Sequence, residues 1–375
     1  MHLVGSQVAV LGLHTSVVRY LSPLVTDVER GHGGASIIQG AVLATLVTGG
    51  LVAGLTLLGR GALARMLDRP ELVGPLAWVA LGILLFALNK VLLATLTASG
   101  RLRLHAVLAG ARGLLMLAAL AALTSAGVGG ADLVLVLVLA EAGLLVPLVI
   151  TLRDDLRIGV WSAACLTWVR THVRFGVLGA GSSLLTELNI RIDVLVLAFF
   201  VDDRAIGIYT LVATLSEAAL QVPMVHRTVL GPSIVRLLER RDGHGLRELV
   251  RRTRARLWPL MALIGVVMVG LHPTLVGLLG ADEAFGGGRL ALVVLLVGVV
   301  IAAGYVPFGL LLAHAGQPLD QTGFVAFLVL LNLIGNLILV PRFGLLGAAI
   351  ATAAVNAVSV PLLRAVAARR LGVAI

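Results

Sequence analysis

Residues Val73–Leu96 read VGPLAWVALGILLFALNKVLLATL, and the only charged side chain in this run is Lys90. A helix rises 1.5 Å per residue, so this run is long enough to cross the roughly 30 Å hydrocarbon core of a bilayer. A strand with open edges would leave backbone groups without partners in lipid, whereas a helix satisfies them internally. The stretch therefore predicts a membrane-spanning helix.

Runs of the same kind fill the chain and predict an all-α, polytopic membrane protein with eleven spans. Hydrophobic residues make up 59% of the 375 positions and charged residues 13%, and the mean hydropathy is +1.05. A soluble protein could not bury that much apolar surface. The predicted spans are Leu3–Tyr20, Gly40–Gly59, Val73–Leu96, Leu104–Leu123, Asp132–Leu152, His172–Phe200, Ala205–Leu230, Leu257–Leu279, Arg289–His314, Asp320–Val340 and Leu345–Leu363.

The arginines between the spans predict the orientation. Nineteen arginines fall on one side of the predicted topology and six on the other, and the richer side is expected to be cytoplasmic. The C-terminus is then cytoplasmic, and the N-terminus of this chain lies on the outer side. Eight of the nineteen lie in the loop Arg236–Arg256, which is either a surface helix on anionic headgroups or, the reading we favour, a plain topology signal. Because the net charge of +10 is distributed between apolar runs, it indicates membrane topology and not a nucleic-acid partner.

The second half of the sequence faintly repeats the first, which predicts two related lobes. We expect an N-terminal lobe at 1–152 with five spans, a cytoplasmic connector at 153–171 and a C-terminal lobe at 172–375 with six spans. The span His172–Phe200 has no counterpart, so we expect that one helix is missing ahead of Met1; the alternative is a protein selected with eleven spans. Repeated halves are typical of transporters with a substrate path between them. The matching segments are Gly127–Ala131 with Gly344–Ala348, Ala98–Arg101 with His314–Gln317, and Leu13–His14 with Val225–His226.

Three stretches resemble a known family. Asn189–Leu197 (NIRIDVLVL) leads, after a short acidic turn, into Ala205–Tyr209 (AIGIY), and the pair is similar to the seventh and eighth helices of polysaccharide-export flippases. Gly12–Tyr20 (GLHTSVVRY) resembles the end of the second helix of that family, and Pro341–Thr352 (PRFGLLGAAIAT) resembles its eleventh-to-twelfth turn. These flippases belong to the multidrug/oligosaccharidyl-lipid/polysaccharide (MOP) exporter superfamily.

The resemblance implies two six-helix lobes around a central cavity in a bacterial cytoplasmic (inner) membrane. It implies alternating access, in which a lipid-linked oligosaccharide or polysaccharide precursor is moved from the cytoplasmic to the outer leaflet. The expected partners are this lipid-linked saccharide, anionic membrane lipids, and a polysaccharide polymerase with its glycosyltransferases.

Charged residues inside the spans are the candidate site, because each costs at least ~2.5–3.5 kcal/mol in lipid and should face protein or water. Glu187 and Arg191 are four residues apart, a spacing that favours an ion pair, either in a cavity or purely structural. Asp193 lies on another face and is the strongest candidate for a functional carboxylate that contacts substrate or a coupling ion. Glu217 and Gln221 share a face of the next span.

Two arginines near the cytoplasmic ends of pseudo-symmetric spans, Arg19 and Arg227, predict a clamp for pyrophosphate, unless both extend to lipid headgroups. Lys90 either contacts an anionic substrate or extends to the interface, and Glu141 either pairs with a buried arginine or carries a proton. Asn332 and Asn336 lie one helical turn apart and are expected to join neighbouring helices.

Signatures of enzymes are lacking in the sequence. There is no Gly-Lys-Ser/Thr phosphate loop and no His-Glu-x-x-His pattern, so we expect no catalytic residues, no cofactor and no bound metal. Transport would then be driven by an ion gradient, the membrane potential or consumption of the product. The alternatives are a drug/cation antiporter of the same superfamily, which the in-span cations Arg191, Arg227 and Lys90 disfavour, and a non-transporting integral-membrane protein.

Overall fold

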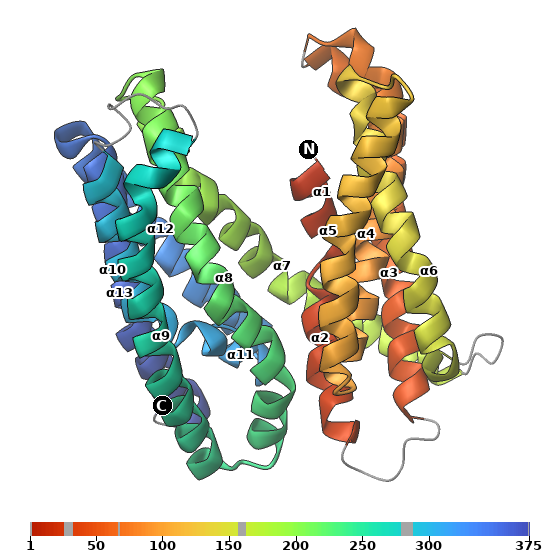
Figure 1. Cartoon of the computed structure of the whole chain (residues 1–375). Helices are drawn as coiled ribbons and strands as arrows, with labels where there is room; N and C mark the ends of the chain where they lie inside the picture. Colours follow the sequence, from red (N-terminus) through yellow and green to blue (C-terminus); the bar gives the residue numbers. More distant parts are fainter. Residues whose placement is uncertain (1, 26–32, 67, 157–162, 279–287, 374) are drawn as a thin grey trace. The chain divides into compact units, whose positions relative to one another are not determined.

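The computed structural model describes residues 2–25, 33–66, 68–156, 163–278, 288–373 and 375, and this part of the chain is almost entirely helical, with no strand (Figure 1). Short 3-10 turns join several of the helices. The α-helices are α1 (His2–Val10), α2 (Leu13–Leu21), α3 (Gly33–Met66), α4 (Val73–Ala98), α5 (Leu102–Ser125), α6 (Leu135–Leu156), α7 (Ala163–Leu197), α8 (Asp203–Glu239), α9 (Gly243–Leu278), α10 (Arg289–Ala303), α11 (Leu311–His314), α12 (Pro318–Phe343) and α13 (Leu345–Leu371).

The predicted all-α membrane fold is confirmed. Within the described residues, eight helices are long and apolar enough to cross a bilayer, and the pair α10 and Val306–His314, bent by 60°, makes up to nine. The bend follows from Gly304 and from Pro307, which cannot donate a backbone hydrogen bond. The eight helices are α3 to α6, α8, α9, α12 and α13.

Two predicted spans differ from the simple apolar helices that we expected. Leu3–Tyr20 is two short helices, because Leu11 and Gly12 adopt φ angles of 47° and 69° and so interrupt the helical path. Gly176 faces this break so closely that a Cβ on it would collide with the carbonyl oxygen of Leu11. Most of His172–Phe200 lies in the longer α7, which ends at Leu197 and is not among the helices long and apolar enough to cross a bilayer.

The chain divides into two compact units, Met1–Leu184 and Leu185–Ile375, with the boundary inside α7. The expected start of the second lobe at residue 172 also falls within α7. In the first unit, α4 packs against α1, α2, α3 and α6, and the buried core includes Val79, Ile83 and Ala87. In the second unit, α10 packs against α8, α9 and α13, and α12 packs against α13.

One pair of segments that the predicted repeat aligns ends its helices in the same way, and this cap also ends α5 at Gly127. At the end of α4, the amide of Gly100 donates to the carbonyl of Thr97 and the amide of Arg101 donates to Leu96. At the end of α11, Gly316 donates to Ala313 and Gln317 donates to Leu312. Gly100 and Gly316 have φ angles of 76° and 82°, which only glycine adopts without strain. The aligned segments therefore form the same left-handed helix cap in both halves.

The arginine-rich stretch 236–256 is mostly helical and not the loop that we expected. Helix α8 continues to Glu239, the chain turns at Arg240–Asp242, and α9 begins at Gly243. The continuation is helical because Leu246 and Val250 pack with Ile234 and Leu363 in a buried cluster. The two long helices therefore extend beyond their apolar segments and are joined by a tight turn.

Candidate functional site

Asp193 on α7 is the centre of a polar cluster inside the second unit. Its side chain is 7% exposed. Oδ2 accepts hydrogen bonds from the hydroxyls of Tyr209 on α8, at 2.7 Å, and Thr352 on α13, at 2.6 Å. Oδ1 accepts from the amide nitrogens of Asn332 and Asn336 on α12, at 3.1 and 2.9 Å. One carboxylate therefore ties four helices together.

The partners of Asp193 are all neutral. No ion pair to this carboxylate occurs among the residues that the structure describes. Four hydrogen bonds stabilise a carboxylate but leave its charge uncompensated in a region that lipid surrounds. A group in this situation gains from binding a proton or a small cation, so the arrangement favours reversible uptake of a positive charge.

The cluster is also rich in oxygen atoms. The amide oxygen of Asn336 is buried without a hydrogen-bond donor, and the amide oxygen of Asn332 accepts from Asn336 at 3.0 Å. With the two oxygens of Asp193 and the hydroxyl of Thr352, these atoms are the ligands that hard cations such as Na⁺ prefer. Asn332 and Asn336 join neighbouring helices, as the sequence predicted, and they also complete the surroundings of Asp193.

Four other predicted residues lie on an accessible face of the second unit. Arg191, Glu217 and Gln221 are exposed and Glu187 is half-buried. The expected ion pair between Glu187 and Arg191 is not formed in the structure. Instead, Arg191 interacts electrostatically with Glu217 of α8. Charged side chains would be costly against acyl chains, so this face of α7 and α8 must contact water or a polar ligand.

The first unit holds its own charged side chains, which contact protein partners. The Nζ of half-buried Lys90 donates to Oε1 of Gln7 on α1 at 3.0 Å. Glu141 pairs with Arg112 at 2.6 Å and accepts a hydrogen bond from Asn89 at 2.7 Å. Of the two roles open to Glu141, the structure therefore shows pairing with an arginine.

The proposed arginine clamp stays a prediction. Arg19 is half-buried on α2, with its guanidinium 6.0 Å from the ring of Tyr20. Arg227 is half-buried on α8. Arg19 belongs to the first unit and Arg227 to the second.

Sequence reasoning missed Tyr209 and Thr352 as partners of Asp193. Both stand in stretches that carry the family resemblance, yet neither is charged, and their contacts join helices that are far apart in the sequence. The available signal was polarity: each is a hydroxyl among apolar neighbours, which must find a partner when buried.

The fold matches solved membrane transporters. An outward-facing multidrug resistance MATE family transporter of the MOP superfamily superposes with a TM-score of 0.84 at 14% identity, covering 99% of this chain and 85% of that one. The Vibrio cholerae MATE transporter VcmN in its bent form matches with 0.76 at 16% identity, covering 98% and 87%. A MOP superfamily transporter from Pyrococcus furiosus, described as having a binding pocket of reverse polarity, matches with 0.84 at 14% identity, covering 99% and 86%. The chain therefore has the fold of MOP-superfamily transporters, as the sequence predicted.

The family follows from the sequence itself. The model of the family described as "Polysaccharide biosynthesis protein" matches residues 35–280, which is more than half of the chain. The chain belongs to this family. A search of curated proteins finds no match.

Proposed function

We propose that this protein is a flippase, which moves a lipid-linked oligosaccharide or polysaccharide precursor from the cytoplasmic to the outer leaflet by alternating access. Membership of a polysaccharide biosynthesis family and the fold of a transporter superfamily support this choice of substrate and reaction. The membrane is the cytoplasmic membrane of a bacterium, with the C-terminus inside. The lipid-linked substrate would come from glycosyltransferases and pass to a polymerase.

The observation that carries the mechanism is the buried Asp193, held by four neutral donors from three helices. We assign to Asp193 the binding of a coupling cation, either a proton or Na⁺. Uptake of the cation would remove the uncompensated charge and change how tightly α8, α12 and α13 are held against α7. A cation gradient could then drive the change of conformation that carries the substrate.

The cationic side chains are proposed to contact the substrate. Arg191 and Gln221 lie on the accessible face of the second unit, and Arg19, Arg227 and Lys90 carry the positive charge that a pyrophosphate-linked saccharide requires. Glu217 interacts electrostatically with Arg191 and would keep its guanidinium in position, and Glu187 adds a second carboxylate to the same face. These residues would bind the saccharide substrate without forming a covalent bond to it.

A drug/cation antiporter is the second candidate. Glu217 is an exposed carboxylate on α8 and could attract a cationic substrate. In the flippase, by contrast, Arg191 would be the residue that meets the cargo and Glu217 its partner. Inhibition of transport by an anionic lipid pyrophosphate, but not by a cationic dye, would support the flippase. The opposite result would support the antiporter.

The test is gradient-driven flipping in proteoliposomes that carry a fluorescent lipid-linked oligosaccharide. Asp193→Asn should lower the rate under an imposed proton or Na⁺ gradient by about tenfold or more, which corresponds to ~1.4 kcal/mol in the barrier. The matched control is Asp203→Asn, an exposed carboxylate at the start of α8, which should change the rate less than about twofold.

Two outcomes count against the proposal. If Asp193→Asn keeps the full response to both gradients, Asp193 is not the coupling site. If the unmodified protein moves no lipid-linked saccharide under any gradient, the flippase assignment fails.

A further inference from the structure

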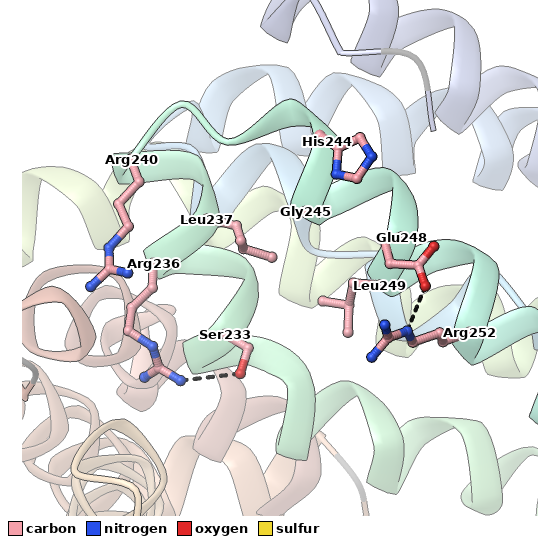
Figure 2. Close-up of a pocket in the computed structure, with 9 residues that line it drawn as sticks. All are labelled: Ser233, Arg236, Leu237, Arg240, His244, Gly245, Glu248, Leu249 and Arg252. Carbon is pink, nitrogen blue, oxygen red and sulfur yellow. Dashed lines mark hydrogen bonds and ion pairs between the residues drawn. The ribbon is translucent and has the colours of Figure 1, made fainter.

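A pocket of about 380 Å³ lies where α8 ends and α9 begins, and it is distinct from the Asp193 cluster. Its walls are the last two turns of α8 and the first three turns of α9. Figure 2 shows Arg236 projecting from the end of α8 and Arg240 from the turn that follows, with His244, Glu248 and Arg252 on α9. The lining residues are Ser233, Arg236, Leu237, Arg240, His244, Gly245, Glu248, Leu249 and Arg252.

Positive charge dominates the rim of the pocket. Arg236 in the last turn of α8 and Arg240 directly after the helix are four residues apart, a spacing at which like charges face each other and repel. Arg236 is held in place by a 3.1 Å hydrogen bond from its guanidinium to the hydroxyl of Ser233. In the part of the chain that the structure describes, no carboxylate forms an ion pair with either arginine.

The one carboxylate of the pocket is already neutralised by its own helix. Glu248 accepts two hydrogen bonds from Arg251, at 2.7 and 2.8 Å, and one from Arg252 at 2.6 Å. Glu248 lies ahead of the apolar segment of α9, and these hydrogen bonds lower its pKa to about 2. It therefore stays ionised and paired with Arg251 and Arg252, which leaves Arg236 and Arg240 free to hold an anion from outside the chain.

The turn between the helices keeps the pocket open. Arg241 has a φ angle of 52°, and the carboxylate of Asp242 caps α9 by accepting from the amide of Gly245 at 2.8 Å. A Cβ on Gly245 would collide with Asp242 and would lie 2.8 Å from the side chain of Leu237. The floor is therefore apolar, formed by Leu237 and Leu249 over a buried cluster.

The position of the pocket suggests which anion would reach it. Helix α8 has 37 residues, so its length of about 55 Å exceeds the roughly 40–45 Å of a whole bilayer. The predicted apolar segment of α8 ends at Leu230, so the pocket residues of α8 follow it within about three helical turns and would lie at the level of the phosphates. There an apolar floor can contact the first carbons of a lipid. A soluble anion would gain nothing from Leu237 and Leu249.

We propose that this pocket binds the phosphate group of an anionic membrane lipid, with Arg236 and Arg240 holding the phosphate oxygens and Leu237 and Leu249 contacting the glycerol and upper acyl carbons. Paired guanidiniums suit phosphate because their donors match its oxygens in geometry and charge. The ligand is a resident lipid, separate from the transported saccharide, and the proposal does not depend on the flippase assignment.

The test measures lipid binding by the purified full chain in zwitterionic detergent micelles doped with increasing amounts of phosphatidylglycerol. The double variant Arg236→Gln/Arg240→Gln should bind phosphatidylglycerol at least about tenfold more weakly, which equals ~1.4 kcal/mol. The matched control Arg241→Gln/Arg247→Gln removes the same charge from the same turn, but neither residue lines the pocket, and it should weaken binding less than about threefold.

A second variant keeps every charge and fills the space. Leu249→Trp should weaken phosphatidylglycerol binding, because the larger side chain occupies the space of the lipid. The dependence of binding on salt concentration should stay unchanged, because every charge is kept. A melting temperature of Leu249→Trp in phosphatidylcholine alone that equals that of the unmodified protein would show that its fold is intact. Arg236 and Arg240 lie near the surface, so the variants that remove their charges are expected to fold.

Parallel titrations with inorganic phosphate and with glycerol 3-phosphate identify the source of the phosphate. Strong binding of phosphatidylglycerol with weak binding of both soluble anions supports a lipid site. Equal losses in the pocket variant and the control, or binding of inorganic phosphate as tight as that of the lipid, would overturn the proposal.

Discussion

Two buried carboxylates in this protein are stabilised in opposite ways. Glu141, 1% exposed, has a cation, Arg112, and one amide, Asn89. Asp193 has four neutral donors and no cation among the described residues. A carboxylate paired with arginine holds its charge permanently, whereas one that is only hydrogen-bonded can gain a positive charge. The first arrangement suits a structural role and the second suits a switch.

The structural role of Glu141 can be tested by removing its charge. Glu141→Gln keeps the shape of the side chain but replaces the carboxylate that pairs with Arg112 by a neutral amide. We therefore expect the free energy of unfolding to fall by about 1–3 kcal/mol. The loss should appear as a lower melting temperature in detergent, without a change in the pH dependence of transport. Asp154→Asn, an exposed residue near the end of α6, is the control and should shift stability by less than about 0.5 kcal/mol. A normal melting temperature for Glu141→Gln would argue against the pairing.

At this scale the sequence identified the ionisable residues inside the spans but predicted few of their contacts. Asp193 and Glu141 were found because an ionisable group in an apolar run is conspicuous. The pairing of Glu187 with Arg191 was inferred wrongly, since spacing along one helix ignores the competing Glu217 on α8. Tyr209 and Thr352 could not be assigned, because their contacts depend on how α8 and α13 pack against α7.

Helices in the second unit approach each other through small residues. A Cβ on Gly298 of α10 would lie 2.6 Å from the Cα of Ala353 on α13, which is backbone and cannot move aside. Gly335 of α12 likewise faces Ala351 of α13, with a Cβ at 3.2 Å. Close backbone approach of this kind is how helices associate in lipid, where burial of apolar surface provides no driving force.

Gly298→Ala should therefore separate α10 from α13. We expect it to lower the free energy of unfolding by about 1–3 kcal/mol, the usual cost of an added methyl group in a packed interface. Gly270→Ala in α9 is the matched control: its Cβ would meet nothing within 4 Å, and alanine favours the helix by up to ~1 kcal/mol. The two variants should thus shift the melting temperature in opposite directions. A shift of the same sign and size in both would contradict the described packing of α10 on α13.

Three helix ends agree closely with the predicted spans. The helices α4, α5 and α12 end at Ala98, Ser125 and Phe343, two or three residues beyond the predicted ends, and each is followed within two residues by a glycine with positive φ. The break at Leu11–Gly12 was missed because the run Leu3–Tyr20 is apolar on both sides of it. The continuation of α8 and α9 through the arginine-rich stretch was missed because charge was taken as a sign of a loop, although Leu246 and Val250 recur at helical spacing.

The whole chain is a multi-pass membrane protein with the MOP-superfamily fold, and composition alone could establish the membrane and the helices. The repeat predicted two lobes, and the resemblance predicted the superfamily. What the sequence could not provide is the three-dimensional convergence of α7, α8, α12 and α13 on one carboxylate. That information resides in contacts between residues up to 159 positions apart.

The predicted orientation can be tested with cysteine labelling, because Cys165 is the only cysteine and is buried. In a Cys165→Ser background, Asp68→Cys should react with an impermeant maleimide added to intact cells, and Arg241→Cys should react only after the membrane is opened. The expectation rests on the excess of arginine on the side of Arg241, since cytoplasmic loops are enriched in positive charge. Labelling of Arg241→Cys in intact cells would contradict the predicted orientation.

The matched caps at Gly100 and Gly316 bear on how the two halves of the chain are compared. Glycine is the only residue that Ala98–Arg101 and His314–Gln317 share at matching positions, yet the torsion angles and the donor–acceptor pattern of the two turns are alike. A Cβ at either glycine would strain this backbone conformation. The two halves are therefore better compared at these turns by backbone torsion angle than by residue identity.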